Sequence, residues 1–459
     1  MLTRALRRGV AVGALIIAFL AILGPAASAA PAPETPVAAE TCQYPEKTDE
    51  QIHIKGCLRD TRDTPPSPVP GVTVTVEDQD GNVIEEVETD ETGVFDVPLP
   101  GEPILNLNKD FTIKIDQDTL PEGADLRDPD RVELTVNFNT TSDQTVVFPI
   151  GDKIEKPSKF IEGVQLAIGG LVFAALLAMA ALGLSMIFGT TGLTNFSHGE
   201  LVTFGALMAW AIDRLPGSIE IAGTNITIIV GVVFAFLMGG VFGLVNDKAL
   251  WKPLRSRGTG IIAMMIVSIG LSIFLRSLYQ YFAGGNSHNY SQYSSVSPWT
   301  VGQISFTSKD VAVFSLAMAV LIAVSLLVQY TRIGKATRAV ADNPALAASS
   351  GINVQRVIAV VWVMGAALAG LSGALLGITQ GFDFQLGFKL LLLIFAAVVL
   401  GGLGTIWGAM VGAFVIGLFV EVSTLWVPAE LKYVGALAIL ILVLLVRPQG
   451  ILGRAQRVG

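Results

Sequence analysis

The chain has 459 residues, of which 52% are hydrophobic and 15% are charged, and its formal net charge is -8. This composition is too apolar and too poor in charge for an ordinary water-soluble protein. Residues 30–160 carry 28 acidic and 11 basic side chains, whereas residues 161–459 carry 10 acidic and 16 basic ones. The acidic front part argues against a nucleic-acid partner, because it would not neutralise phosphates. The uneven distribution indicates two different parts in series.

The first residues have the pattern of an export signal. Three arginines precede the apolar stretch 10–23, and the small-residue site Ala27-Ser28-Ala29 follows it. We predict a signal peptide over residues 1–29, with an uncleaved signal anchor as the alternative. In both cases the next part of the chain lies outside the cytoplasm.

Residues 30–70 are predicted to form a linker that holds both cysteines of the chain. An oxidising compartment favours a bond between Cys42 and Cys57 over two free thiols. The bond would close a loop of 16 residues and stabilise the fold by about 3 kcal/mol in the loop-entropy model. We therefore predict a Cys42–Cys57 disulfide.

Residues 71–150 predict a small all-β sandwich outside the cytoplasm. Short alternating or apolar runs predict strands, separated by turns such as Asp80-Gly81-Asn82. The expected strands are 72–76, 83–87, 94–100, 111–115, 132–138 and 144–150. The segment 71–101 resembles the carboxypeptidase-regulatory-like family through this turn and its Thr89-Asp90-Glu91-Thr92-Gly93 turn. The resemblance implies a fold and no particular function. The acidic residues lack the spacing of a calcium loop, and we expect no metal site.

From residue 161 onward the apolar runs are long enough to cross a bilayer, which takes about 20 residues per helix. The basic loops around residues 248–257, 332–356 and 447–457 are expected on the cytoplasmic side. Together with the exported front domain, they predict nine spans and a cytoplasmic C-terminus. The expected spans are 161–188, 199–213, 225–246, 259–282, 309–330, 354–378, 390–400, 408–425 and 433–446. Seven spans result if the stretch at 401–404 is a re-entrant hairpin.

Two groups of residues within the apolar part are candidates for a translocation path. Gly401, Gly402, Gly404 and Gly408 indicate either a broken helix along a path or close packing of small residues, and both readings stay open. Asn195, His198, Gly199 and Glu200 lie at a span boundary, where ionisable groups often mark a pathway. We interpret Asn195 and His198 as a polar turn at a broken-helix junction, with direct solute contact as the alternative.

The segment 331–353 predicts a short helix along the cytoplasmic surface. Asp342 or Asn343 can cap this helix, Pro344 fits its first turn, and Gly351 can end it. A transporter driven by separate ATPase subunits needs such a rigid lever.

The same segment resembles the coupling loop of ABC-transporter permeases of the branched-chain amino acid family. The pattern T-R-x-G-x-x-x-R-A-x-x-x-x-P-x-x-A-x-x-x-G-I is matched at Arg332, Gly334, Arg338, Pro344, Ala347 and Gly351, and the coupling residues that the resemblance implies are these six and Asp342. Residues 192–200, 399–413 and 446–453 are similar to further motifs of that family, in the same order. The resemblance covers about 165–454 and implies a multi-span α-helical permease domain over 161–454.

This resemblance also implies partners and a place in the cell. It implies a bacterial inner-membrane importer with a second permease subunit, two cytoplasmic ATPases and an external solute-binding protein. The chain lacks the phosphate-binding pattern G-x-x-x-x-G-K-[ST], so we expect no enzyme activity and no cofactor in this chain, with ATP and Mg used by the partner ATPases. The implied solutes are branched-chain or related amino acids. A urea or short-amide importer is the alternative, and a secondary transporter or channel is the alternative from another class.

Overall fold

The computed structural model describes residues 44, 51–62, 66–106, 109–121, 125–126, 132–138, 143–151, 158–221, 224–292, 298–428, 431–446 and 450–452. The predicted signal peptide and Cys42 lie outside these residues. The chain divides into two compact units, with the boundary between Lys156 and Pro157.

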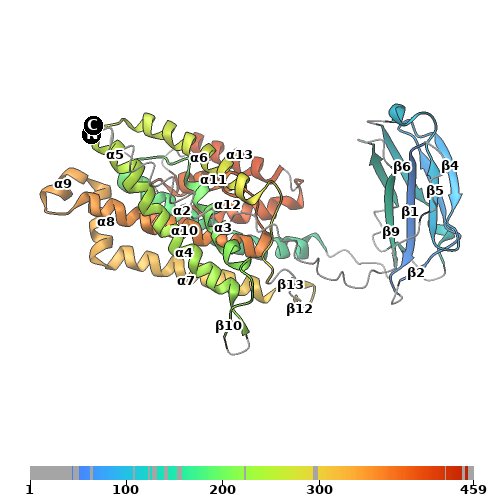
Figure 1. The fold of residues 1–459 in the computed structure, drawn as a ribbon, viewed down its shortest axis with the longest axis horizontal. Coiled ribbons are helices and arrows are strands. Elements are labelled where there is room, and N and C mark those ends of the chain that lie inside the picture. The colour runs from blue at the N-terminus through green and yellow to red at the C-terminus, as the bar shows by residue number, and fades with distance from the viewer. Residues whose placement is uncertain are drawn as a thin grey trace. The chain divides into compact units, whose positions relative to one another are not determined.

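The first unit is a sandwich of two β-sheets (Figure 1). One sheet has the order β2-β1-β9-β7, and β5 also pairs with β1; the other has the order β4-β3-β6-β8. The strands of the first sheet are β1 (His53–Asp60), β2 (Ser67–Pro68), β5 (Val94–Pro98), β7 (Asp125–Leu126) and β9 (Gln144–Gly151). Those of the second are β3 (Thr73–Glu77), β4 (Val83–Glu88), β6 (Asp110–Ile115) and β8 (Glu133–Asn137). Two short 3-10 helices, η1 (Pro103–Asn106) and η2 (Gln117–Thr119), connect strands.

The core of the sandwich follows from alternation along its strands, because successive side chains of a strand point to opposite faces. On β3, Val74 and Val76 are fully buried, while the alternating Thr73 and Thr75 are half-buried. Phe111 and Phe138 meet edge to face with ring centroids 5.5 Å apart. The predicted β-sandwich is confirmed.

The predicted start of the sandwich at residue 71 is wrong, because β1 and β2 lie within the predicted linker. β1 pairs in parallel with β9 and antiparallel with β5, so it is a central strand. The sequence of β1 does not have the apolar pattern of a buried strand, because it contains His53, Lys55 and Gly56. Cys57 is buried on β1 and is not a free thiol. The Cys42–Cys57 pairing stays a prediction, since Cys42 lies outside the described residues.

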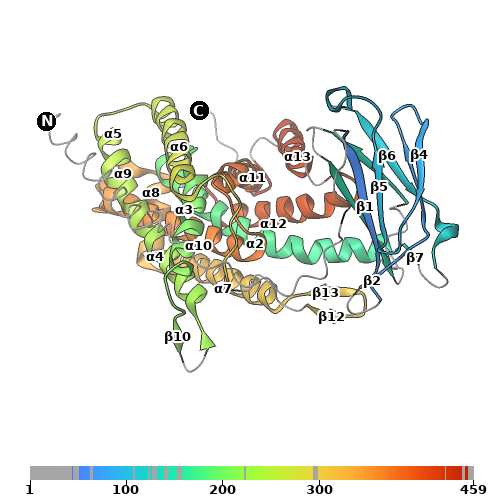
Figure 2. The same cartoon turned by 45° about the vertical axis from the view of Figure 1, so that its right-hand side comes forward.

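The second unit is a bundle of helices (Figure 2). Its elements are α2 (Lys159–Thr191), α3 (His198–Asp213), α4 (Thr227–Asn246), the π-helical turn η3 (Asp247–Trp251), α5 (Lys252–Ser256), α6 (Ile261–Ala283), α7 (Ser308–Tyr330), α8 (Arg332–Asp342), α9 (Pro344–Ser349), α10 (Val354–Gln380), α11 (Leu386–Gly401), α12 (Ile406–Val422), the 3-10 turn η4 (Ser423–Leu425) and α13 (Lys432–Val446). Two small hairpins, β10 (Glu220–Ile221) with β11 (Thr224–Asn225) and β12 (Trp299–Val301) with β13 (Ile304–Phe306), connect helices. We call the end at which α5, α8 and α9 lie the α8 end.

Burial divides the helices into a centre and a periphery. The apolar windows of α2 and α10 are 89% and 78% buried, whereas those of α6 and α7 are 22% and 28% buried. Exposed side chains such as Ile266 and Ile273 on α6 are apolar, as a surface in contact with lipid requires. The second unit is therefore a multi-span membrane domain.

Six helices in the described part of the chain are long and apolar enough to cross a membrane: α2, α4 with its extension to Ser256, α6, α7, α10 and α12 with η4. The other three expected spans correspond to α3 and α11, with 16 residues each, and α13, with 15. These are shorter than the roughly 20 residues of a perpendicular crossing. All nine expected helices are present, and the number of complete crossings stays a prediction.

The central helices approach one another through glycine. A Cβ atom on Gly205 of α3 would collide with the backbone of Gly370 on α10, and a Cβ atom on Gly365 of α10 would lie 2.9 Å from the carbonyl oxygen of Gly183 on α2. Membrane helices use small residues in this way because close backbone packing replaces the missing hydrophobic driving force. α10 is therefore fixed against both α2 and α3.

Candidate functional site

The connection between α2 and α3 is a non-helical segment inside the bundle. α2 ends at Thr191 and is capped by Gly192, whose φ of 66° stops the helix, and α3 begins at His198. Residues between them run alongside α6: Gly192 lies beside Ile261, the first residue of α6, and the Phe196 amide donates to the Ser268 hydroxyl over 3.0 Å. Glu200 then meets Ser272, halfway along α6, through a hydrogen bond of 2.9 Å. Eleven residues of α6 correspond to about 16 Å, so α3 starts deep in the bundle.

Polar side chains replace the missing helical hydrogen bonds of this segment. Asn195 Oδ1 accepts from the Ser197 amide at 3.1 Å and from the Ser197 hydroxyl at 2.7 Å. His198 Nε2 lies 3.0 Å from the Ala180 carbonyl oxygen of α2. Because a carbonyl only accepts, Nε2 carries the proton. The segment is a polar turn at a broken-helix junction, a form of backbone that membranes tolerate only within protein or along a water-filled path.

The junction keeps unused hydrogen-bonding atoms. In the described part of the chain, Asn195 Nδ2, His198 Nδ1 and Glu200 Oε2 have no partner, although all three residues are at most 1% exposed. Unpaired polar atoms at such depth are costly. These three atoms are therefore available as hydrogen-bond donors and acceptors within the bundle.

Gly199 lies where α3 crosses α11. A Cβ atom on Gly199 or on Gly387 would collide with the backbone of the other glycine. The Gly387 amide donates to Thr203 Oγ1 over 2.9 Å, which fixes the start of α11 against α3. Gly199 thus has a packing role at the junction.

The glycine cluster at 401–408 forms the turn between α11 and α12. Gly401 and Gly408 contact each other through their backbones, and Gly402 and Gly404 have φ angles of 111° and 76°. The Ser185 hydroxyl of α2 donates to the Thr405 carbonyl over 3.0 Å and holds the turn against α2. Gly401, Gly402 and Gly408 are buried in this packing, whereas Gly404 borders a groove described below.

Two short helices, α8 and α9, cover the α8 end. Thr331 caps α8 by accepting from the Gly334 amide at 3.1 Å, and Asn343 caps α9 by accepting from the Leu346 amide at 3.0 Å. Of the two predicted caps, Asn343 is therefore the one used, with Pro344 directly after it. Gly351, with a φ of 84°, follows α9.

The two helices are amphipathic. Gly334, Thr337, Val340 and Ala347 are buried against the bundle. The other side of the pair is exposed and contains four of the predicted coupling residues: Arg332, Arg338, Asp342 and Pro344. Ile333 and Leu346 are 49% and 64% exposed, so this side also presents apolar side chains.

A groove of about 1090 Å³ lies between α8 and the α11–α12 turn. Its lining includes the last turn of α2 around Thr190, Arg338 of α8, and Gly404. The groove therefore connects the coupling helices with the end of α2 that leads into the junction. Asn195, His198 and Glu200 do not line it.

Sequence reasoning missed the α6 residues that complete the junction. Ser268 and Ser272 lie four residues apart on one face of an otherwise apolar helix, and Tyr279 donates from its hydroxyl to the Glu200 carbonyl over 3.2 Å. Two serines at this spacing on an apolar span could have indicated a polar contact with another part of the bundle. It also missed the buried ion pair between Asp247 and Arg255, which are 2.6 Å apart.

A comparison with protein families decides the identity of the second unit. Residues 166–445 match the family described as "Branched-chain amino acid transport system / permease component". The chain belongs to this permease family. The matched range leaves out the β-sandwich of this permease and covers the helices from α2 to α13.

Individual relatives agree with the family. This permease is 32% identical over 304 residues to the high-affinity branched-chain amino acid transport system permease protein LivH of Salmonella typhimurium, covering 65% of this chain and 98% of the relative. It is 29% identical over 307 residues to BraD of Pseudomonas aeruginosa, covering 64% and 96%. It is 24% identical over 255 residues to the ribose import permease RbsC of Escherichia coli, covering 52% and 72%. No solved structure matches the permease.

Proposed function

We propose that this chain is the membrane-spanning subunit of an ATP-driven importer for branched-chain or related amino acids. The α8–α9 pair carries the proposal: two capped helices with a buried face toward α7 and α10 and an exposed face that holds basic and apolar side chains. A separate ATPase subunit that binds this face would move α8 and α9 together. The relatives named above supply the solute class.

The proposed partners are a second permease subunit, two cytoplasmic ATPase subunits and an external solute-binding protein. ATP and Mg would bind to the ATPases, with no cofactor and no catalysis in this chain. The basic side chains of α5 and α8 support a cytoplasmic location for the α8 end. The β-sandwich and the C-terminus would then lie outside and inside the cell, respectively.

Within this importer we propose the α2–α3 junction as part of the translocation path. The unpaired atoms of Asn195, His198 and Glu200 support this role, because a polar solute offers them partners during passage. The polar turn described above is one state of this site. Rearrangement driven from α8 and α9 would produce the other.

Uptake of labelled leucine and labelled urea in a strain without this chain tests the proposal. Restoration of leucine uptake by the wild-type gene supports it, and restoration of urea uptake alone moves the solute to the amide class. Uptake that persists after ATP depletion with the membrane potential maintained would contradict ATP coupling and favour a secondary transporter or channel.

A variant separates the coupling role from the solute. Leu346→Glu places a charge in the exposed apolar face of α9 and should abolish uptake while leaving membrane abundance unchanged. Val301→Glu is the matched control, since Val301 is 66% exposed on β12 and has no expected contact with an ATPase. Normal uptake by Leu346→Glu would contradict docking at α9.

A further inference from the structure

α4 continues beyond its last α-helical residue into an elbow formed by η3 and α5. The Lys252 amide donates to the Asp247 carbonyl, five residues earlier, which defines a π turn. Pro253 lacks an amide hydrogen, and its ring would collide with the carbonyl four residues before it in a regular α-helix. The wider π turn avoids this collision. Single π turns inside helices occur frequently at functional sites.

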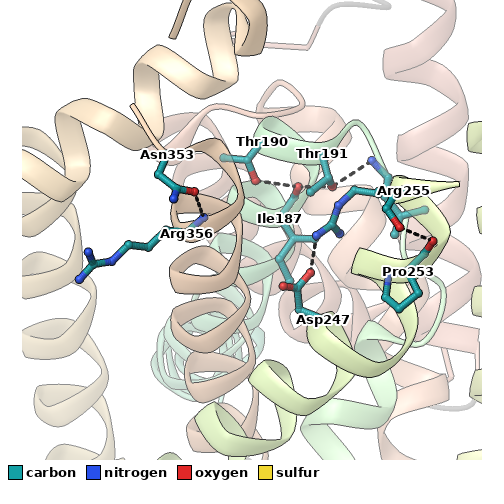
Figure 3. A network of polar contacts seen from close by, with 10 residues as sticks. Ile187, Thr190, Thr191, Asp247, Pro253, Arg255, Asn353 and Arg356 are labelled. Atoms are coloured by element: carbon teal, nitrogen blue, oxygen red, sulfur yellow. Dashed lines mark hydrogen bonds and ion pairs between the residues drawn. The ribbon is translucent and has the colours of Figure 1, made fainter. Parts of the chain in front are cut away.

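The elbow encloses a buried ion pair. Figure 3 shows Arg255 extending from α5 toward Asp247, and the two side chains are 2.6 Å apart. The Asp247 side chain is 1% exposed and that of Arg255 13%. Removal of two charges from water costs several kcal/mol per ion, so such a pair is weak evidence for a stabilising role.

The pair is incompletely satisfied. In the described part of the chain, Asp247 Oδ2 and the Arg255 atoms Nε and Nη1 have no hydrogen-bond partner. The indole nitrogens of Trp251 and Trp362 are likewise buried and unpartnered. A site that leaves several strong donors and acceptors unused can gain hydrogen bonds in another arrangement. The elbow therefore concentrates buried charge and buried indole nitrogens at its contact with α10.

The elbow contacts the helix that follows the coupling helices. Trp251 stacks on Trp362 of α10 with ring centroids 5.7 Å apart and planes 16° from parallel. About two turns before Trp251, on α4, a Cβ atom on Gly243 would collide with the Trp362 backbone. Only residues 350–353 separate α9 from α10, so the two helices are joined by a short connection.

α10 in turn contacts the helix that leads into the junction. Gly365, three residues after Trp362, packs against Gly183 and Ile187 of α2. α2 then ends at Thr191, and the non-helical segment with Asn195 begins at Gly192. α10 is thus held between the elbow on one side and the last turns of α2 on the other.

We propose that Asp247, Arg255 and Trp251 form a positioning unit that sets α10 against α4, so that movement of α8 and α9 reaches the α2–α3 junction. The inference rests on the proposed function. Its consequence is specific: without the unit, the assembled complex still hydrolyses ATP but transports little solute. A purely structural ion pair would instead change the amount of folded protein.

The test uses the full-length chain assembled with its partner permease, ATPases and binding protein in proteoliposomes. The variants are Asp247→Asn, Arg255→Gln, their double substitution and the conservative Asp247→Glu. Labelled leucine taken up and ATP hydrolysed are measured together. We expect uptake per ATP to fall about tenfold in both single variants and in the double variant, a typical magnitude for coupling between sites. Asp247→Glu should retain most of the wild-type ratio.

Another ion pair of the membrane domain, away from the elbow, provides the matched control. Lys389 and Asp383 pair at the start of α11, with side chains 45% and 21% exposed. Lys389→Gln and Asp383→Asn should leave uptake per ATP unchanged. If the elbow variants do not accumulate, Trp251→Leu removes the stack without an unpaired charge and should lower the same ratio.

Two results would overturn the inference. One is an unchanged ratio in the single variants or in Trp251→Leu. The other is a double variant that recovers both abundance and uptake, because removal of a whole structural pair is often neutral. Failure of the wild-type complex to take up leucine would refute the proposed solute instead. The elbow variants would then be compared with the wild type on the solute that it carries.

Discussion

Gly334 is the position at which the docking of α8 can be tested with one methyl group. A Cβ atom there would collide with the Cα, C and O atoms of Val328, all of which belong to the backbone of α7. These atoms cannot rotate away as a side chain can, so α8 has to shift outward in Gly334→Ala. The Thr331 hydroxyl that accepts from the Gly334 amide at 3.1 Å would shift relative to it as well.

The size of the effect follows from two opposing contributions. Overpacking costs about 1–3 kcal/mol, and three backbone contacts favour the upper part of that range. Alanine in place of glycine returns about 1 kcal/mol through helix propensity. The difference, about 1–2 kcal/mol, lowers the ratio of docked to undocked α8 by a factor of about 5–30.

Limited proteolysis in membranes measures this ratio, because cleavage tracks the population of the open form when opening is fast. Trypsin has sites at Arg332, Lys335 and Arg338 on α8. We expect cleavage there to be about 5–30 times faster in Gly334→Ala, together with reduced uptake. Gly270→Ala on α6 is the control, since no atom lies within 4 Å of its Cβ position. Wild-type cleavage and uptake in Gly334→Ala would refute the reasoning.

Three further predictions concern packing and charge. Gly387→Ala should lower membrane abundance, since its Cβ atom meets the Gly199 backbone at a cost of about 1–3 kcal/mol; equal abundance with Gly285→Ala, which has open space, would contradict this. Ile113→Ala, at a fully buried position, should destabilise the sandwich by about 2–5 kcal/mol in hydrogen exchange, whereas the neighbouring Thr112→Ala should change it by less than about 0.5 kcal/mol. A side-chain hydrogen bond from Arg62 holds the pKa of Asp60 below its ordinary value, so its stabilisation is complete above about pH 4 and is lost as the pH falls through the folded-state value. Asp60→Asn should therefore lower protection of β1 at pH 7 more than at pH 3, and an equal loss at both pH values would exclude this origin.

Most of the membrane domain could be predicted from its sequence because long apolar runs have few alternatives to a helix. The depth at which α3 begins could not, since it depends on Ser268 and Ser272, about 70 residues later in the chain. The contacts of the elbow could not be predicted either: Pro253 signals an interruption of the helix, but the Trp251–Trp362 stack joins residues more than 100 positions apart.

The β-sandwich shows the opposite case, in which local signals failed at a central strand. β1 acquires its place from parallel pairing with β9, about 90 residues later. Such pairing leaves no hairpin turn in the sequence to reveal it. Phe95 covers Gly56 so closely that a Cβ atom would overlap its ring, which explains a glycine within a buried strand.

The polar junction also has a consequence for biogenesis. When the ribosome has completed α3, two partners of the junction on α6 are still to be synthesised: Ser268, which accepts from the Phe196 amide, and Ser272, which donates to Glu200. Lipid cannot satisfy these groups in the meantime. We therefore expect the α2–α3 segment to stay at a hydrated site of the insertion machinery until α6 has been synthesised.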